Sequence, residues 1–381
     1  MFKLNSITIR NYKNIHSSYV TFDNNLTLIT GYSGKGKTNF LDAISIIIVR
    51  MSTPLPRLST GMVYVDDLKN ALDSFNSESD WFISASVNYA EKKYLAIECK
   101  KASVLEAKKT EEKYDEMQEI LLDKYNRKSY LPVFRYFTEN RYSLTELISA
   151  YLDFVKSTPD EGKCFRSLIN TFFAELEEND NAGIYTNDEG KYQYFDGQKY
   201  YDLNSCGSGI RSLLYIITDL AAQATFLNTT LPSSNRSIQG LVLIDGIEQN
   251  LHPEYQWKVI PALRKTFPSV QFIVSTVSPM VISSASECEI INVNDGEFIT
   301  LSDAYGYDTG DILELKLGSR SLPSEFKAAK AKIDECIDNN DKDALQKTET
   351  ELKLQYGEKS SLYQRVKEYV SVNDWRIDAC E

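Results

Sequence analysis

A glycine-rich loop near the start of the chain carries the residue types that hold phosphate groups. Residues 31–38 read GYSGKGKT, a complete match to the pattern G-x-x-x-x-G-K-S/T. The apolar segment LTLIT precedes this loop, and a helix-like segment follows it. Glycines let backbone N–H groups wrap a phosphate, and the start of the next helix adds partial positive charge. The sequence therefore predicts a phosphate-binding loop between a strand and a helix.

The side chains in and beside this loop define which phosphate ligand to expect. We expect Lys37 to neutralise the β- and γ-phosphate oxygens of ATP, and the Thr38 hydroxyl to ligate Mg²⁺. The residues expected to contact the nucleotide are Gly31, Ser33, Gly34, Lys35, Gly36, Lys37, Thr38 and Asn39. ATP and Mg²⁺ are thus the predicted cofactors.

A second candidate ligand for Mg²⁺ is an acidic residue much later in the chain. The segment LVLID, residues 241–245, is four apolar residues that end in an acid. This pattern is typical of a Walker B strand, which would deliver Asp245 to the same Mg²⁺ as Thr38. Buried strands often end in an acidic residue, so this segment alone is weak evidence. It indicates a Mg²⁺ ligand because the same chain also contains the phosphate-binding loop.

The elements that position these residues follow from hydrophobic periodicity. Residues 3–10 and 18–29 alternate apolar and polar positions, as half-buried strands do, and strand-like patterns recur at 82–89 and 93–99. Residues 38–50 are predicted to form the helix after the loop.

The later part of the chain predicts a parallel sheet. Residues 131–137 form a buried-strand candidate and residues 212–227 a buried-helix candidate. Two apolar strands, 240–245 and 271–276, flank a helix that starts near Pro253. Strand, helix and strand with such apolar strands indicate parallel pairing.

Two further regions are predicted to be helical. Residues 102–129 are rich in lysine and glutamate and are typical of an exposed helical arm, and residues 144–155 read as another helix. Residues 322–372 are predicted to form polar helices with apolar stripes, which we expect to be buried against a neighbouring subunit or a partner. The predicted organisation is an N-terminal lobe (1–100), an arm or insert (101–165), a C-terminal lobe (166–318) and a helical oligomerisation or partner module (319–381).

Composition restricts the cellular context. The chain has 381 residues, of which 42% are hydrophobic and 25% charged, as in an ordinary soluble protein. No run approaches the roughly 20 apolar residues that span a bilayer, and the N-terminal segment has no apolar signal core. We therefore expect a cytoplasmic protein with no membrane contact. The six cysteines are scattered, which favours free thiols over a structural zinc site.

The charge balance bears on nucleic-acid binding. A formal net charge of −12 disfavours broad nonspecific contact with a phosphate backbone. The lysine-rich stretch 92–113 could form a local basic patch. Glutamates are interleaved with its lysines, so a solvated helix face is the favoured interpretation.

Three segments together resemble a known family. The opening ITIRNYKNI, the segment LNSCGSGIRSLLYIITDLA and the segment IDGIEQNLHPEYQWKVIPALRKTFPSVQFIVSTVSP are similar to the RecF/SMC-like ABC ATPases. The resemblance implies an α/β fold, an ABC-type ATPase head whose P-loop sheet carries an antiparallel β lobe. It also implies that Lys13 lies near the phosphates. Ser208 and Gly209 match the signature motif, which in this family faces the nucleotide of a second head, so a homo-oligomer is implied.

The end of the chain resembles a narrower group. The segment YGYDTGDILELKLG followed by paired helices is similar to the stand-alone ATPases of bacterial anti-phage operons, including the ATPase subunits of Septu systems. Those subunits act with an HNH nuclease. The resemblance implies an HNH nuclease partner in a separate chain, and contact with DNA through that complex.

The departures from the family pattern concern hydrolysis. The position after Asp245 is Gly246, where the family places a catalytic glutamate, and Val277 replaces the switch histidine. Loss of a positioned general base costs on the order of 10²–10⁴-fold in rate. Glu248, a second acidic position of the family pattern, is the remaining candidate catalytic residue. We expect weak or absent hydrolysis, unless Glu248 or a group of a partner subunit takes over.

The sequence thus supports two functions. The first is an ATP-binding regulatory subunit of an anti-phage complex that controls a separate nuclease. The alternative is an active RecF/SMC-like DNA-repair ATPase that hydrolyses ATP on DNA, which would need the missing glutamate and histidine. His252 is either a contact across a dimer or a helix-start residue, and Arg135 and Arg141 have either a structural ion-pair role or a nucleotide role.

Overall fold

A six-stranded sheet forms the core of the larger of two compact units, Met1–Ile312 and Leu313–Glu381, in the computed structural model. The strand order is β13-β12-β3-β11-β10-β6. Its strands are β3 (Leu26–Thr30), β6 (Val133–Phe137), β10 (Gly240–Ile244), β11 (Val270–Ser275), β12 (Glu289–Asn294) and β13 (Glu297–Leu301). The structure describes residues 2–52, 81–89, 92–99, 117–124, 126–127, 129–138, 159–226, 238–319, 324–339, 342–360, 362–364 and 366–370.

Parallel pairing places the carboxyl ends of several strands at the same edge of this sheet. Strand β10 pairs in parallel with β6 and β11, and β3 pairs in parallel with β11 and β12. Every residue of β3, β10 and β11 is buried, as the continuous apolar sequences predict. The carboxyl ends of β3, β10 and β11 therefore lie at one edge, from which the loops 31–38, 245–252 and 276–278 extend.

An antiparallel sheet forms the second lobe, with the order β2-β1-β4-β5. It consists of β1 (Lys3–Tyr12), β2 (Ile15–Thr21), β4 (Phe82–Tyr89) and β5 (Lys92–Cys99). Helix α1 (Lys37–Ser52) contacts both sheets, and its apolar side chains join them in one hydrophobic core. The predicted α/β class with an antiparallel lobe is confirmed.

The predicted continuous strand over 18–29 is wrong. The segment forms the end of β2 in the antiparallel sheet and then most of β3 in the six-stranded sheet. The polar residues 23–25 lie between these strands, and Phe22 N–H donates to Asn5 O at 2.8 Å. The apolar run from Leu26 is buried at every position rather than alternately, because β3 is covered on both faces.

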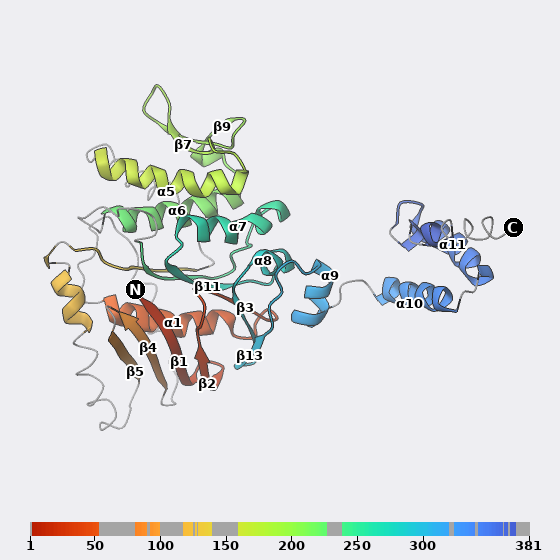
Figure 1. The fold of residues 1–381 in the computed structure, drawn as a ribbon, viewed down its shortest axis with the longest axis horizontal. Helices are drawn as coiled ribbons and strands as arrows, with labels where there is room; N and C mark the ends of the chain where they lie inside the picture. The colour runs from red at the N-terminus through yellow and green to blue at the C-terminus, as the bar shows by residue number, and fades with distance from the viewer. Residues whose placement is uncertain are drawn as a thin grey trace. The chain divides into compact units, whose positions relative to one another are not determined.

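Three helices pack together on one side of the six-stranded sheet, and α1 lies on the other side (Figure 1). They are α5 (Pro159–Glu177), α6 (Ser208–Phe226) and α7 (Pro253–Thr266). A small sheet of β7 (Gly183–Thr186), β8 (Tyr192–Phe195) and β9 (Tyr200–Asp202) lies between α5 and α6 in sequence. The 3-10 turn Leu203–Ser205 leads from it into α6. Short helices α8 (Pro279–Ser284) and α9 (Thr309–Asp311) and the π-helical turn Ile312–Lys316 complete the described elements up to residue 319.

The smaller unit has a hydrophobic core of its own. Helices α10 (Ser324–Asp338) and α11 (Lys342–Tyr356) and the residues that follow bury Ile333, Leu345, Leu352, Leu362, Tyr363 and Val366 together. The apolar stripes expected to face another chain therefore pack against one another. The reason is the short connection after residue 338, which lets two amphipathic helices cover each other's apolar faces.

The predicted arm is only partly described. Residues 117–124 are helical, and Met117 and Leu121 belong to the main hydrophobic core, so this part is not an exposed arm. Residues 102–116, the helix predicted at 144–155, and Arg141 lie outside the described residues. In the parts of the chain that are described, we find no helix with the length and apolar character needed to span a membrane.

Candidate nucleotide-binding site

The backbone of the 31–38 loop requires glycine at two positions. Gly31 has φ +133°, and a β-carbon there would lie 2.2 Å from the carbonyl oxygen of Val293 in β12. Gly36 has φ +107°, and its β-carbon would lie 2.6 Å from the side-chain nitrogen of Asn14. L-residues with a side chain rarely adopt either backbone conformation, and at both positions a β-carbon would lie too close to its neighbour. The loop is thus held tightly between the two sheets.

Lys37 and Lys35 have different surroundings, although both belong to the loop. The Lys37 ammonium donates to the carbonyl oxygens of Gly31 and Tyr32, at 2.9 and 3.1 Å, so its charge lies across the mouth of the loop. The Lys35 ammonium forms an ion pair with Asp295 in the β12–β13 turn, with 2.6 Å between Nζ and Oδ2. The Lys35 backbone N–H donates to the Tyr32 carbonyl oxygen at 3.3 Å, and Lys35 is not among the residues that line the pocket described below.

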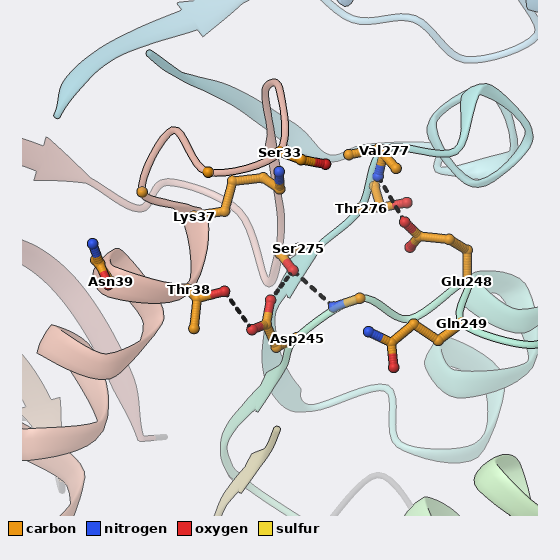
Figure 2. A pocket seen from close by; sticks show the side chains of 13 residues that line it. Ser33, Lys37, Thr38, Asn39, Asp245, Glu248, Gln249, Ser275, Thr276 and Val277 are labelled. Atoms are coloured by element: carbon orange, nitrogen blue, oxygen red, sulfur yellow. Dashed lines mark hydrogen bonds between the residues drawn. The ribbon is translucent and has the colours of Figure 1, made fainter. Parts of the chain in front are cut away.

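Thr38, Asp245 and Ser275 form a hydrogen-bonded network at the edge of the sheet (Figure 2). The Thr38 hydroxyl donates to Asp245 Oδ2 at 2.7 Å, and the Ser275 hydroxyl donates to Asp245 Oδ1. The oxygen of Ser275 also accepts from the Gly246 N–H at 2.8 Å. The carboxylate of Asp245 is buried and fixed in orientation by two hydroxyl groups.

This network fits a small divalent cation. Hydroxyl and carboxylate oxygens are the ligands that Mg²⁺ takes in proteins, and it is held by few protein ligands beside substrate phosphates. Thr38 lies in the first turn of α1 and Asp245 directly follows β10, yet their side chains lie within hydrogen-bonding distance. The two residues predicted to ligate Mg²⁺ are thus brought together.

A second hydrogen bond joins the turns after β10 and β11. The Val277 N–H donates to Glu248 Oε1 at 2.9 Å. The Val277 side chain, at the position of the family's histidine, is 42% exposed and cannot donate a hydrogen bond. Glu248 therefore connects the turn after β10 to the turn after β11.

These groups surround a pocket of about 320 Å³. Its lining residues are Ser33, Gly34, Gly36, Lys37, Thr38, Asn39, Asp245, Gly246, Glu248, Gln249, Ser275, Thr276 and Val277. Sequence reasoning did not single out Gln249, Ser275 or Thr276. The only signal for the last two was their place at the end of an apolar strand, next to Val277.

Five predicted nucleotide contacts are not among the residues that line this pocket: Lys13, Gly31, Lys35, Ser208 and Gly209. Lys13 forms an ion pair with Asp42 of α1, and Asp42 also accepts from the Tyr136 hydroxyl at 2.8 Å. Burial, and then the carboxylates of Asp42 and Asp245, raise the pKa of Tyr136 well above its ordinary value, so this hydroxyl remains a donor. The electrostatic partner of Lys13 in this structure is therefore a carboxylate.

Ser208 and Gly209 start helix α6. A β-carbon on Gly209 would lie 2.5 Å from the Asn250 carbonyl oxygen, so the signature segment packs closely against the turn that follows Asp245. Ser208 is exposed. This placement leaves Ser208 accessible to another molecule and away from the phosphate pocket of its own chain.

His252 and Arg135 both make structural contacts within the chain. His252 is the N-cap of α7, and its Nδ1 accepts from the Glu254 N–H at 3.3 Å. Arg135 forms a buried ion pair with Asp219 of α6. The ion pair joins the edge strand β6 to the helix that covers it.

Comparison with known proteins gives a family and two kinds of relatives. Residues 58–282 match the AAA ATPase domain family. The retron Vc95 probable ATPase of Vibrio cholerae is 35% identical over 118 residues, which cover 30% of this chain and 23% of that protein. The Septu protein PtuA of Bacillus thuringiensis is 31% identical over 97 residues, which cover 25% of this chain and 24% of that protein. The matches thus span less than a quarter of each relative's own length.

Among solved structures, an SMC head bound to the C-winged helix domain of ScpA is similar to this chain, with a TM-score of 0.44 and 17% sequence identity. The similarity covers 78% of this chain and 97% of that one.

Proposed function

The chain belongs to the AAA ATPase domain family, and from that premise we propose that it is an ATP-binding regulatory subunit that hydrolyses ATP slowly. The observation that supports this proposal is that one pocket contains the groups expected to bind phosphate but a glycine where the family pattern has the catalytic glutamate. The phosphate loop, Lys37 and the Thr38–Asp245 pair are in place. The residue after Asp245 is a glycine with φ +60°, a conformation that a glutamate would adopt only with strain.

Binding energy and rate depend on different parts of this pocket. Loop N–H groups, Lys37 and Mg²⁺ held by Thr38 and Asp245 would supply phosphate affinity. Bound Mg²⁺ would neutralise charge on the β- and γ-phosphates. Acceleration of hydrolysis needs a group that takes the proton of the attacking water, and neither Gly246 nor Val277 can do so. ATP would therefore stay bound for long periods.

Long occupancy suits a regulatory role. A ligand shifts a conformational equilibrium only by its differential affinity for the two states. Glu248 and Val277 join the two turns beside the expected γ-phosphate, so ATP and ADP would contact this junction differently. We propose that occupancy of the pocket, rather than turnover, is the signal.

We propose that the signal acts in an anti-phage defence complex in the cytoplasm. The names of the retron and Septu relatives support the defence context. In this proposal the chain forms a homo-oligomer in which Ser208 and Gly209 face the nucleotide of a neighbouring copy. A separate HNH nuclease is the regulated partner, and DNA is contacted through that nuclease. Ser208 at the start of α6 is exposed, which is compatible with such an arrangement, whereas Gly209 is buried and would contribute through the backbone.

The alternative, an active DNA-repair ATPase, depends on Glu248. This carboxylate lines the pocket, and its buried Oε2 has no hydrogen-bond partner in the described part of the chain. A water molecule there could lose its proton to Glu248. The bond from Oε1 to the Val277 N–H limits this role, because it holds the carboxylate against the neighbouring turn.

Phosphate release from purified protein with Mg·ATP, alone and with partner and DNA, separates the two functions. The regulatory proposal expects turnover well below about 1 s⁻¹, the low end of ordinary enzyme rates. Turnover near that rate that disappears in Glu248→Gln would refute it and make Glu248 the working base. Lys37→Ala serves as the control that should not bind ATP.

A further inference from the structure

Gln249 occupies the space beside Gly246, in the turn that follows β10. A β-carbon built on Gly246 would lie 2.8 Å from Gln249 Nε2 and 3.1 Å from Gln249 Cδ. A side chain at position 246 would therefore come too close to the Gln249 amide, which would have to move. An amide from three residues further along the chain thus lies beside the backbone position where the family pattern has a glutamate.

The turn holds this amide in the phosphate pocket. The Gln249 N–H donates to Gly246 O at 3.1 Å, and the Ile247 N–H donates to Ser275 O in β11 at 3.2 Å. Gln249 lines the same pocket as Lys37 and Asp245. Figure 2 shows the amide end of Gln249 directed toward Asp245, below the Glu248 carboxylate.

We propose that Gln249 orients the attacking water in this pocket, in place of a general base. The inference rests on the proposed function and adds a residue to its site. A carboxamide can accept two hydrogen bonds through its oxygen and donate two through its NH₂ group, so it can hold a water molecule. It has no basicity near neutral pH, so it cannot remove the proton. Glutamine has such a water-orienting role in other phosphoryl-transfer sites.

The hydrolytic step then proceeds slowly. The water oxygen forms a bond to the γ-phosphorus, and the bond from the γ-phosphorus to the bridging oxygen breaks. The electron pair of that bond leaves with ADP, and the proton of the water passes to a γ-phosphate oxygen. Orientation without proton removal explains why an intact phosphate cradle would coexist with low turnover.

Gln249→Glu tests this directly, because it exchanges the amide for a carboxylate of the same size at the same place. We expect phosphate release to rise at least about ten-fold, toward the 10²–10⁴-fold of a positioned base. The increase in phosphate release should be present above the pKa of the new carboxylate and should be lost as the pH falls through that pKa. The wild-type rate should not show this fall. The gain should persist with Glu248→Gln, since glutamine still accepts from the Val277 N–H.

Two further variants complete the experiment. Gln249→Ala should lower the residual turnover about ten-fold while calorimetric affinity for Mg·ATP changes less than about two-fold. Gln198→Glu, the same chemical change at an exposed position of the β8–β9 turn, should leave both quantities unchanged. Gln249→Glu protein that binds Mg·ATP normally but turns over no faster than wild type would overturn the inference. A wild-type protein that does not bind Mg·ATP would overturn the proposed function, and the inference with it.

Discussion

Replacing Ser275 by alanine tests the network that fixes Asp245. The Ser275 oxygen takes part in two hydrogen bonds, one donated to a buried carboxylate and one accepted from the Gly246 N–H at 2.8 Å. The residue is 1% exposed. The variant removes a hydroxyl from a buried polar network, so its partners lose bonds that water replaces poorly.

The expected loss of stability follows from these two bonds. A hydrogen bond to a charged group contributes about 1.5–3 kcal/mol, and a buried N–H left without a partner costs about 1–3 kcal/mol. We expect the free energy of unfolding to fall by about 2–4 kcal/mol. With the denaturant dependence of roughly 3 kcal/mol per molar urea found for large domains, the midpoint should fall by about 1 M.

Urea unfolding and calorimetric titration with Mg·ATP measure the two consequences. Loss of the fixed Asp245 orientation should weaken Mg·ATP binding about ten-fold, equivalent to about 1.4 kcal/mol. Binding of ATP without Mg²⁺ should change less. Ser205→Ala is the matched control, since its exposed hydroxyl makes one bond, of 3.1 Å to Asp202 O, and should cost less than about 0.5 kcal/mol. A loss in Ser275→Ala as small as in this control would refute the reasoning.

Three other predictions follow from the same structure. Lys37→Ala should abolish ATP binding in isothermal titration, because it removes the cation that spans the phosphate loop; unchanged affinity would refute the site. Asp219→Ala should lower the free energy of unfolding by about 3–5 kcal/mol in urea, because it leaves Arg135 charged and buried; the double variant with Arg135→Met should recover part of this loss. Deletion of residues 322–381 should leave the calorimetric affinity for Mg·ATP unchanged, because α10 and α11 bury their apolar side chains in a hydrophobic core of their own; a clear loss of affinity would refute this reasoning.

Local patterns were sufficient for the elements that hold phosphate. The loop over residues 31–38 needs glycine at fixed positions to take its backbone conformation, and lysine and threonine at fixed positions to meet the ligand. These requirements are contiguous, so they are visible in the sequence. The same holds for Asp245, because an apolar strand that ends in an acid places that acid at the sheet edge whatever its neighbours are.

The sequence also indicated the substitutions at Gly246 and Val277, since comparison with a family pattern needs only the order of residues. It did not reveal why glycine suits position 246. That depends on φ +60° and on the Gln249 side chain, which reaches back over three residues in a turn fixed by β11.

Only the tertiary structure decided which side chains share the pocket. The division of residues 18–29 between two sheets arises from long-range pairing, because the alternation of polar residues does not say which sheet a strand joins. The bond from Ser275 to Asp245 and the bond from Glu248 to Val277 depend on β10 and β11 being parallel neighbours in one register. Lys13 lies beside Asp42 because the turn after β1 meets α1. Such contacts join residues far apart in the chain, so their free energy is gained only when the whole sheet has formed.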